Sequence, residues 1–98
     1  MNEKWIGLDP TSGPLERRDD RVLRPRPASL DGHVVGLVAN GLGRGEELLE
    51  RVYAGIAART GVAGAVRVRK SSVSVPPEPA DWARLTSEAT VAITGFGG

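Results

Sequence analysis

The apolar residues of the chain fall into strand-like runs that alternate with helix-like spacing. Residues 34–39 are almost continuously apolar, which is typical of a strand covered on both faces in a parallel sheet. The next expected element is a helix over about residues 46–60. The apolar face of this helix would be formed by Leu48, Leu49, Val52, Tyr53 and Ile56. Gly61 follows the helix at a position where a left-handed residue is favoured.

The rest of the chain repeats this alternation. Residues 65–70 alternate valine with arginine, which indicates a strand with one solvated face at the edge of a sheet. Pro79 suits the first turn of a short helix, and Trp82 and Leu85 are its expected core contacts. A last strand is expected over about residues 90–94.

The order strand, helix, strand, helix, strand predicts an α/β fold. Right-handed crossovers would join the strands into an open parallel sheet of order 2-1-3, of the three-layer Rossmann-like or flavodoxin-like class. Residues 31–98 would form this βαβαβ half domain. Residues 1–30 are rich in proline and in charges of both signs. Their apolar residues follow neither the two-residue period of a strand nor the 3.6-residue period of a helix, so we expect an extended, solvated arm that packs along the domain.

Composition narrows the classes of function. The chain has 98 residues, 13 basic against 12 acidic side chains, one histidine (His33) and no cysteine. A net charge of +1 gives no reason to expect a nucleic-acid or membrane partner. The start of the chain lacks the apolar segment of a signal peptide, so a cytoplasmic location is expected. We expect no metal site, no disulfide and no cofactor.

The predicted topology places a binding crevice at one rim of the sheet. The chain reverses its winding at the first strand, and ligands of open α/β sheets bind beyond the carboxyl ends of the strands at such a point. The candidate site residues in the loops at this rim are Asn40, Gly41, Lys70, Ser71, Ser72, Gly95, Gly97 and Gly98. The ammonium and the hydroxyls of residues 70–72 would orient a carboxylate of a small-molecule or thiol substrate. The alternative is that these three residues only solvate the sheet edge.

The glycine-rich segment 41–45 is a weak candidate for a nucleotide-binding loop. It reads G-x-G-x-G rather than G-x-G-x-x-G, and no P-loop lysine follows. Glu46 and Glu47 would lie in the first helical turn, where they complement the helix dipole and repel a phosphate. A tight turn that needs glycine for its backbone is the better interpretation.

Several segments together resemble a known family. "LDPT" (8–11), "LDGHVVGLVANG" (30–41), the helix with "ELL", the "RVRKSS" strand and the closing "AITGFGG" are similar to the UGSC family of bacterial selenoproteins and their cysteine homologues. The similarity runs along essentially the whole chain. In that family the glycine-rich turn after the strand is followed by selenocysteine or cysteine and then by Gly-Ser-Cys. A more distant resemblance is to the selenocysteine-containing subunits of glycine, sarcosine, betaine and proline reductases.

The resemblance implies a thiol- or selenol-dependent oxidoreductase. Its reactive residue would follow Gly98, where a UGA codon for selenocysteine would have been taken as a stop, and residues 1–98 would hold no catalytic residue and be inactive alone. The third strand, apolar and without its next neighbour, is then expected to mediate self-association.

Two alternatives to the oxidoreductase remain open. Sulfur carriers and ubiquitin-like modifiers end in Gly-Gly, as Gly97 and Gly98 do, but they begin with a β-hairpin. The other alternative is a non-catalytic α/β interaction module.

Overall fold

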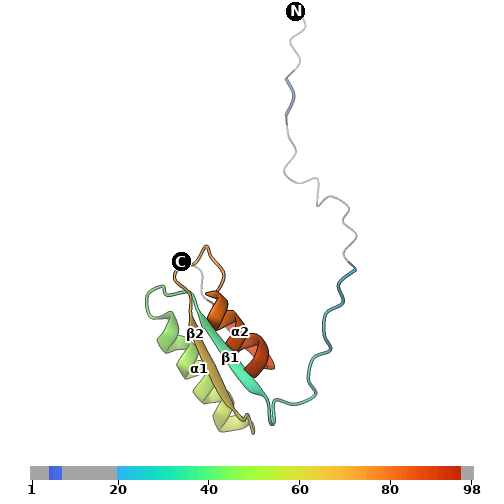
Figure 1. The fold of residues 1–98 in the computed structure, drawn as a ribbon, viewed down its shortest axis with the longest axis vertical. Helices are drawn as coiled ribbons and strands as arrows, with labels where there is room; N and C mark the ends of the chain where they lie inside the picture. The colour runs from blue at the N-terminus through green and yellow to red at the C-terminus, as the bar shows by residue number, and fades with distance from the viewer. Residues whose placement is uncertain (1–4, 8–19, 96–98) are drawn as a thin grey trace, which may run out of the picture.

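The computed structural model describes residues 5–7 and 20–95. The described residues form an α/β fold with a helix between each pair of consecutive strands (Figure 1). The elements are β1 (Val34–Ala39), α1 (Gly45–Arg59), β2 (Gly64–Arg69), α2 (Pro79–Glu88) and β3 (Val91–Gly95). No helix in these two segments is both long and apolar enough to cross a membrane.

The three strands form one parallel sheet of order β2-β1-β3. This confirms the predicted topology, including the edge position of β2. The two helices lie on opposite faces of the sheet, α1 against β1 and β3 and α2 against β2 (Figure 1). The described residues therefore form the three layers of an open α/β sheet, as predicted.

The core is centred on β1, whose residues from Val35 to Ala39 are all buried. On the α2 face, Val38 packs with Val66, Val68 and Leu85. On the α1 face, Leu49 is buried to 2% exposure. As predicted, β1 is covered on both faces, whereas β2 buries its valines and exposes Arg67 and Arg69.

Three of the residues expected to face the core are exposed instead. Leu48 and Val52 on α1 are 46% and 39% exposed, because Leu49 faces the sheet and these two side chains lie on the neighbouring stripe of the helix. Trp82 is 56% exposed. Only Leu85 of the predicted pair reaches the sheet from the short helix α2.

The predicted left-handed conformation of Gly61 is also wrong. The chain leaves α1 through Thr60 in an extended conformation, and Gly61 is not among the described glycines with positive φ. The N–H of Gly61 instead donates to Asp31 Oδ1 at 2.6 Å. A β-carbon on Gly61 would lie 2.9 Å from the same oxygen. Glycine is needed here for the close approach of a carboxylate, not for its backbone angles.

The described part of the N-terminal segment differs from the expected packed arm. Residues 20–30 form no helix or strand, and residues 20–29 are all exposed, including Val22 and Leu23. Pro25, Pro27 and the interleaved charges leave little apolar surface to bury. This part of the chain therefore does not pack along the domain, and the division of the chain at residue 30 stays a prediction.

Candidate substrate-binding site

The carboxyl ends of the three strands meet at one rim of the sheet. Ala39 at the end of β1 pairs with Arg69 of β2 and with Gly95 of β3. The N–H of Lys70 donates to the carbonyl of Ala39 at 2.8 Å. Residues 40 and 70 therefore leave the sheet side by side, and β3 ends beside them.

The turn after β1 is built on glycine, as predicted. Gly41 and Gly43 have φ values of 81° and 49°, which only glycine adopts without strain. A β-carbon on Gly41 would also lie 3.3 Å from the carbonyl oxygen of Lys70. These glycines thus let the loops after β1 and β2 approach each other closely.

The N-terminus of α1 carries its own acidic side chains. Glu46 pairs with Arg69 at 3.0 Å, and Glu47 pairs with Arg44 at 2.6 Å and with Arg51 at 3.2 Å. These carboxylates already complement the positive end of the helix. The geometry supports the interpretation of the glycine-rich segment as a structural turn.

A groove of about 470 Å³ opens from this rim along the α2 face of the sheet. It exists because α2 covers β2 and leaves the outer side of β3 open, so that Ala92 and Thr94 are exposed. Most of its wall is apolar, and its polar residues include Asn40, Lys70 and Thr94. The lining residues are Val38, Asn40, Lys70, Pro77, Trp82, Leu85, Thr86, Ala89, Thr90, Val91, Ala92 and Thr94.

The predicted site residues divide between this groove and its surroundings. Asn40 and Lys70 line the groove, and Gly95 ends β3 at the rim. Ser71 and Ser72 are exposed and do not line it; Ser72 Oγ accepts the N–H of Ser74 at 3.3 Å, a contact within the loop. Gly97 and Gly98 lie outside the described residues.

Lys70 is half-buried, and its ammonium is held by the loop that follows β2. Nζ donates to the carbonyl oxygen of Val73 at 3.1 Å. Within the part of the chain that the structure describes, Lys70 has no carboxylate partner.

The aromatic wall of the groove was missed by reasoning from the sequence. Trp82 and Pro77 line the groove, whereas the three-residue spacing of Trp82 and Leu85 assigned the tryptophan to the core. The available signal was the cluster of prolines at 76, 77 and 79 immediately before it. Such a cluster keeps the chain extended up to the start of the helix, and this favours a first helical turn that stays at the surface.

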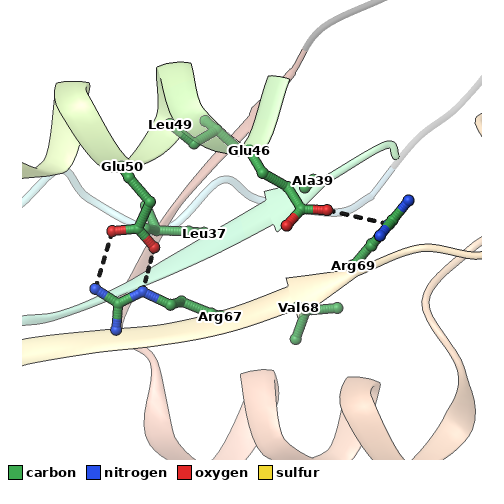
Figure 2. A pocket seen from close by; sticks show the side chains of 8 residues that line it. All are labelled: Leu37, Ala39, Glu46, Leu49, Glu50, Arg67, Val68 and Arg69. Carbon is green, nitrogen blue, oxygen red and sulfur yellow. Dashed lines mark hydrogen bonds and ion pairs between the residues drawn. The ribbon is translucent and has the colours of Figure 1, made fainter. Parts of the chain in front are cut away.

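The opposite face of the sheet holds a smaller pocket of about 170 Å³ between α1 and β2. Figure 2 shows Glu50 of α1 in a bidentate ion pair with Arg67 of β2, and Glu46 beside Arg69. The hydrogen bonds from Arg67 hold the pKa of the Glu50 carboxyl below its usual value, and the carboxylate in turn raises the pKa of Arg67. The Arg67 guanidinium also lies 5.7 Å from the centroid of the Tyr53 ring. Since these charges neutralise one another, we interpret this pocket as a structural contact between α1 and β2.

His33 lies at the other end of the sheet and has a structural role. Its Nδ1 is 2.8 Å from Thr90 Oγ1, and its carbonyl accepts the N–H of Ala63 at 2.8 Å. Among residues 5–7 and 20–95 there is no group of three side chains that could hold a metal ion.

Comparison with known proteins identifies the family. The model that describes the UGSC family matches residues 7–98. No curated protein and no solved structure matches the chain, and the more distant resemblance to the reductase subunits stays a prediction. The match covers nearly the full length and includes every strand and helix that builds the rim, so the chain belongs to the UGSC family.

Proposed function

We propose that this chain forms the substrate-holding half of a thiol- or selenol-dependent oxidoreductase whose reactive selenocysteine or cysteine follows Gly98. The observation that carries the proposal is the pairing of Gly95 with Ala39. This pairing ends β3 at the rim from which Asn40 and Lys70 line the groove. A reactive residue a few positions beyond Gly95 would therefore belong to a loop that starts at the mouth of the groove.

The chemistry follows from the Gly-Ser-Cys sequence that the family resemblance implies after the reactive residue. A selenol, or a thiol of lowered pKa, is ionised at neutral pH and acts as a nucleophile. The substrate would take up two electrons and two protons while the selenol and the cysteine thiol three residues later form a selenenyl sulfide. An external dithiol would then reduce this bond and become a disulfide.

Alkylation of the protein purified from its native source tests this proposal. At about pH 6, well below the ~8.5 pKa of an ordinary thiol, iodoacetamide should modify one residue in the peptide that follows β3. Prior oxidation should block the reaction, and added dithiol should restore it. If no residue beyond Gly98 is modified, the oxidoreductase proposal is wrong and the interaction module becomes the better account.

The alternative of a sulfur carrier fits the fold less well. Carriers of that class begin with a β-hairpin, whereas the described residues form three parallel strands with a helix between each consecutive pair. The alkylation experiment also bears on this alternative, because a carrier that ends in Gly97-Gly98 would offer iodoacetamide no selenol or thiol after β3.

A further inference from the structure

Lys70 differs from its neighbours in how its charge is balanced. Arg67 pairs with Glu50, and Arg69 pairs with Glu46. Lys70 follows these residues directly, but in the described segments it contacts only the carbonyl oxygen of Val73. An ammonium has three N–H donors, so two remain available to a ligand at the mouth of the groove.

The walls around Lys70 make an interaction with its charge stronger than at an open surface. Val38, Leu85 and Trp82 line the same groove as Lys70, and a pairing of charges next to apolar walls is screened less than one in bulk water. The volume of about 470 Å³ falls within the range of about 300–1,000 Å³ that is usual for small-molecule sites. The groove therefore combines one cation with a surface suited to an apolar body.

The charge balance of the rim favours a monoanion. Lys70 is the only cation that lines the groove among the described residues. The acids of the nearby helix N-termini are paired with arginines: Glu46 with Arg69, Glu47 with Arg44 and Arg51, and Asp81 with Arg84. A phosphate dianion would therefore have one available ammonium for two charges, whereas a single carboxylate is matched by Lys70 alone.

We propose that the groove binds a small organic carboxylic acid, with its carboxylate on Lys70 and its apolar part against Trp82 and Leu85. This binding proposal depends on the proposed function in one respect, the choice of the end of the ligand that reacts. Because β3 ends at the same rim, the carboxylate end would lie nearest to the carboxyl end of β3. The binding itself requires no reactive residue.

Tryptophan fluorescence gives a direct test, since Trp82 forms part of the wall. A Trp5→Phe background leaves Trp82 as the sole tryptophan of residues 1–98. This protein is titrated with 3-phenylpropionate, with the neutral 3-phenylpropionamide and with inorganic phosphate. We expect a saturable change with the carboxylate, and an affinity about tenfold or more weaker for the amide, because a charge-assisted hydrogen bond is lost. Phosphate should bind no better than the amide.

Three variants make the test specific. Lys70→Ala should weaken carboxylate binding about tenfold and leave amide binding unchanged, and Lys70→Arg should retain most of the affinity. Arg59→Ala is the control, because Arg59 is another cation that contacts a backbone carbonyl, that of Gly55, and lies at the far end of α1. It should bind like the parent. Thermal unfolding of each variant confirms that the fold is retained.

Two results would overturn the proposal. One is equal affinity for the acid and the amide, or for the parent and Lys70→Ala. The other is no saturable change with any probe in the millimolar range, which would show that the groove is not a site for small carboxylic acids. Neither result affects the outcome of the alkylation experiment. Failure of the ligand assignment can therefore be distinguished from failure of the proposed function.

Discussion

Gly36 of β1 lies directly against Leu85 of α2: a β-carbon at position 36 would come within 2.9 Å of Leu85 Cδ2 and within 3.3 Å of the β-carbon of Ala89. The absence of a side chain in the middle of the central strand is what lets α2 pack onto the sheet. It thereby sets the position of the helix that forms one wall of the groove.

Replacement of Gly36 by valine should therefore destabilise the fold. We expect the free energy of unfolding to fall by about 1–3 kcal/mol, since overpacking forces the helix away from the sheet. Urea unfolding followed by circular dichroism measures the change. Gly64→Ala is the control, because a β-carbon there meets nothing within 4 Å. Equal stability of the Gly36→Val variant and the parent would show that α2 is not held in this position.

The contact between Asp31 and Gly61 should be non-additive on mutation. Gly61→Ala places a β-carbon 2.9 Å from Asp31 Oδ1, and we expect it to cost about 1 kcal/mol of unfolding free energy. In an Asp31→Ala background the crowding is gone and the same change at position 61 should cost much less. A double-mutant cycle by urea denaturation measures this difference. Strictly additive effects would contradict the close contact.

The Glu50–Arg67 ion pair should give a small, pH-dependent contribution to stability. Hydrogen bonds from Arg67 lower the pKa of Glu50 from its usual 4.5. A carboxyl with a lowered folded-state pKa stabilises the fold above its unfolded pKa, and this contribution is lost as the pH falls through the folded value. Since both side chains are about half exposed, the stabilisation is expected to be below about 1 kcal/mol.

Glu50→Gln is the variant that tests this contribution. Its stability deficit relative to the parent should be present at pH 6–7 and shrink below about pH 4.5. In an Arg67→Met background the same substitution should have little effect at any pH. A deficit that is independent of pH, or that persists without Arg67, would assign Glu50 a role other than ion pairing.

In residues 1–98 alone, the outer edge of β3 should promote self-association. In the described residues β3 is an edge strand, with Ile93 half-buried and Ala92 exposed at its centre. An unpaired edge without charged residues is a template for pairing with another chain. Sedimentation velocity over a range of concentrations should show association by the parent and a shift toward monomer for Ala92→Lys. Ala80→Lys adds the same charge on α2 and should leave association unchanged; similar behaviour of the two variants would exclude β3 as the contact.

The fold was predictable because its signals are local. The continuous apolar run of β1 predicts a strand buried on both faces, and the alternation of valine and arginine in β2 predicts an edge strand. The topology then follows from the right-handed crossover rule. Because parallel strands end at a common rim, the proximity of Asn40 and Lys70 could also be predicted from their positions after β1 and β2.

The details that were missed depend on contacts that are distant in sequence or on the tilt of a helix. Asp31 reaches Gly61 from 30 residues away, and no local pattern at Gly61 indicates a carboxylate partner. Trp82 and Leu85 share a helical face, but only the placement of α2 on Gly36 decides which of them is buried. The serines at 71 and 72 follow the strand end as Lys70 does, yet the loop turns them away from the groove.

The nucleotide sequence that follows the codon for Gly98 tests most directly the claim that a reactive residue follows Gly98. The account predicts an in-frame TGA followed by an open reading frame that begins with codons for Gly-Ser-Cys. A TAA codon at this place, or a TGA followed by scattered stop codons, would contradict it.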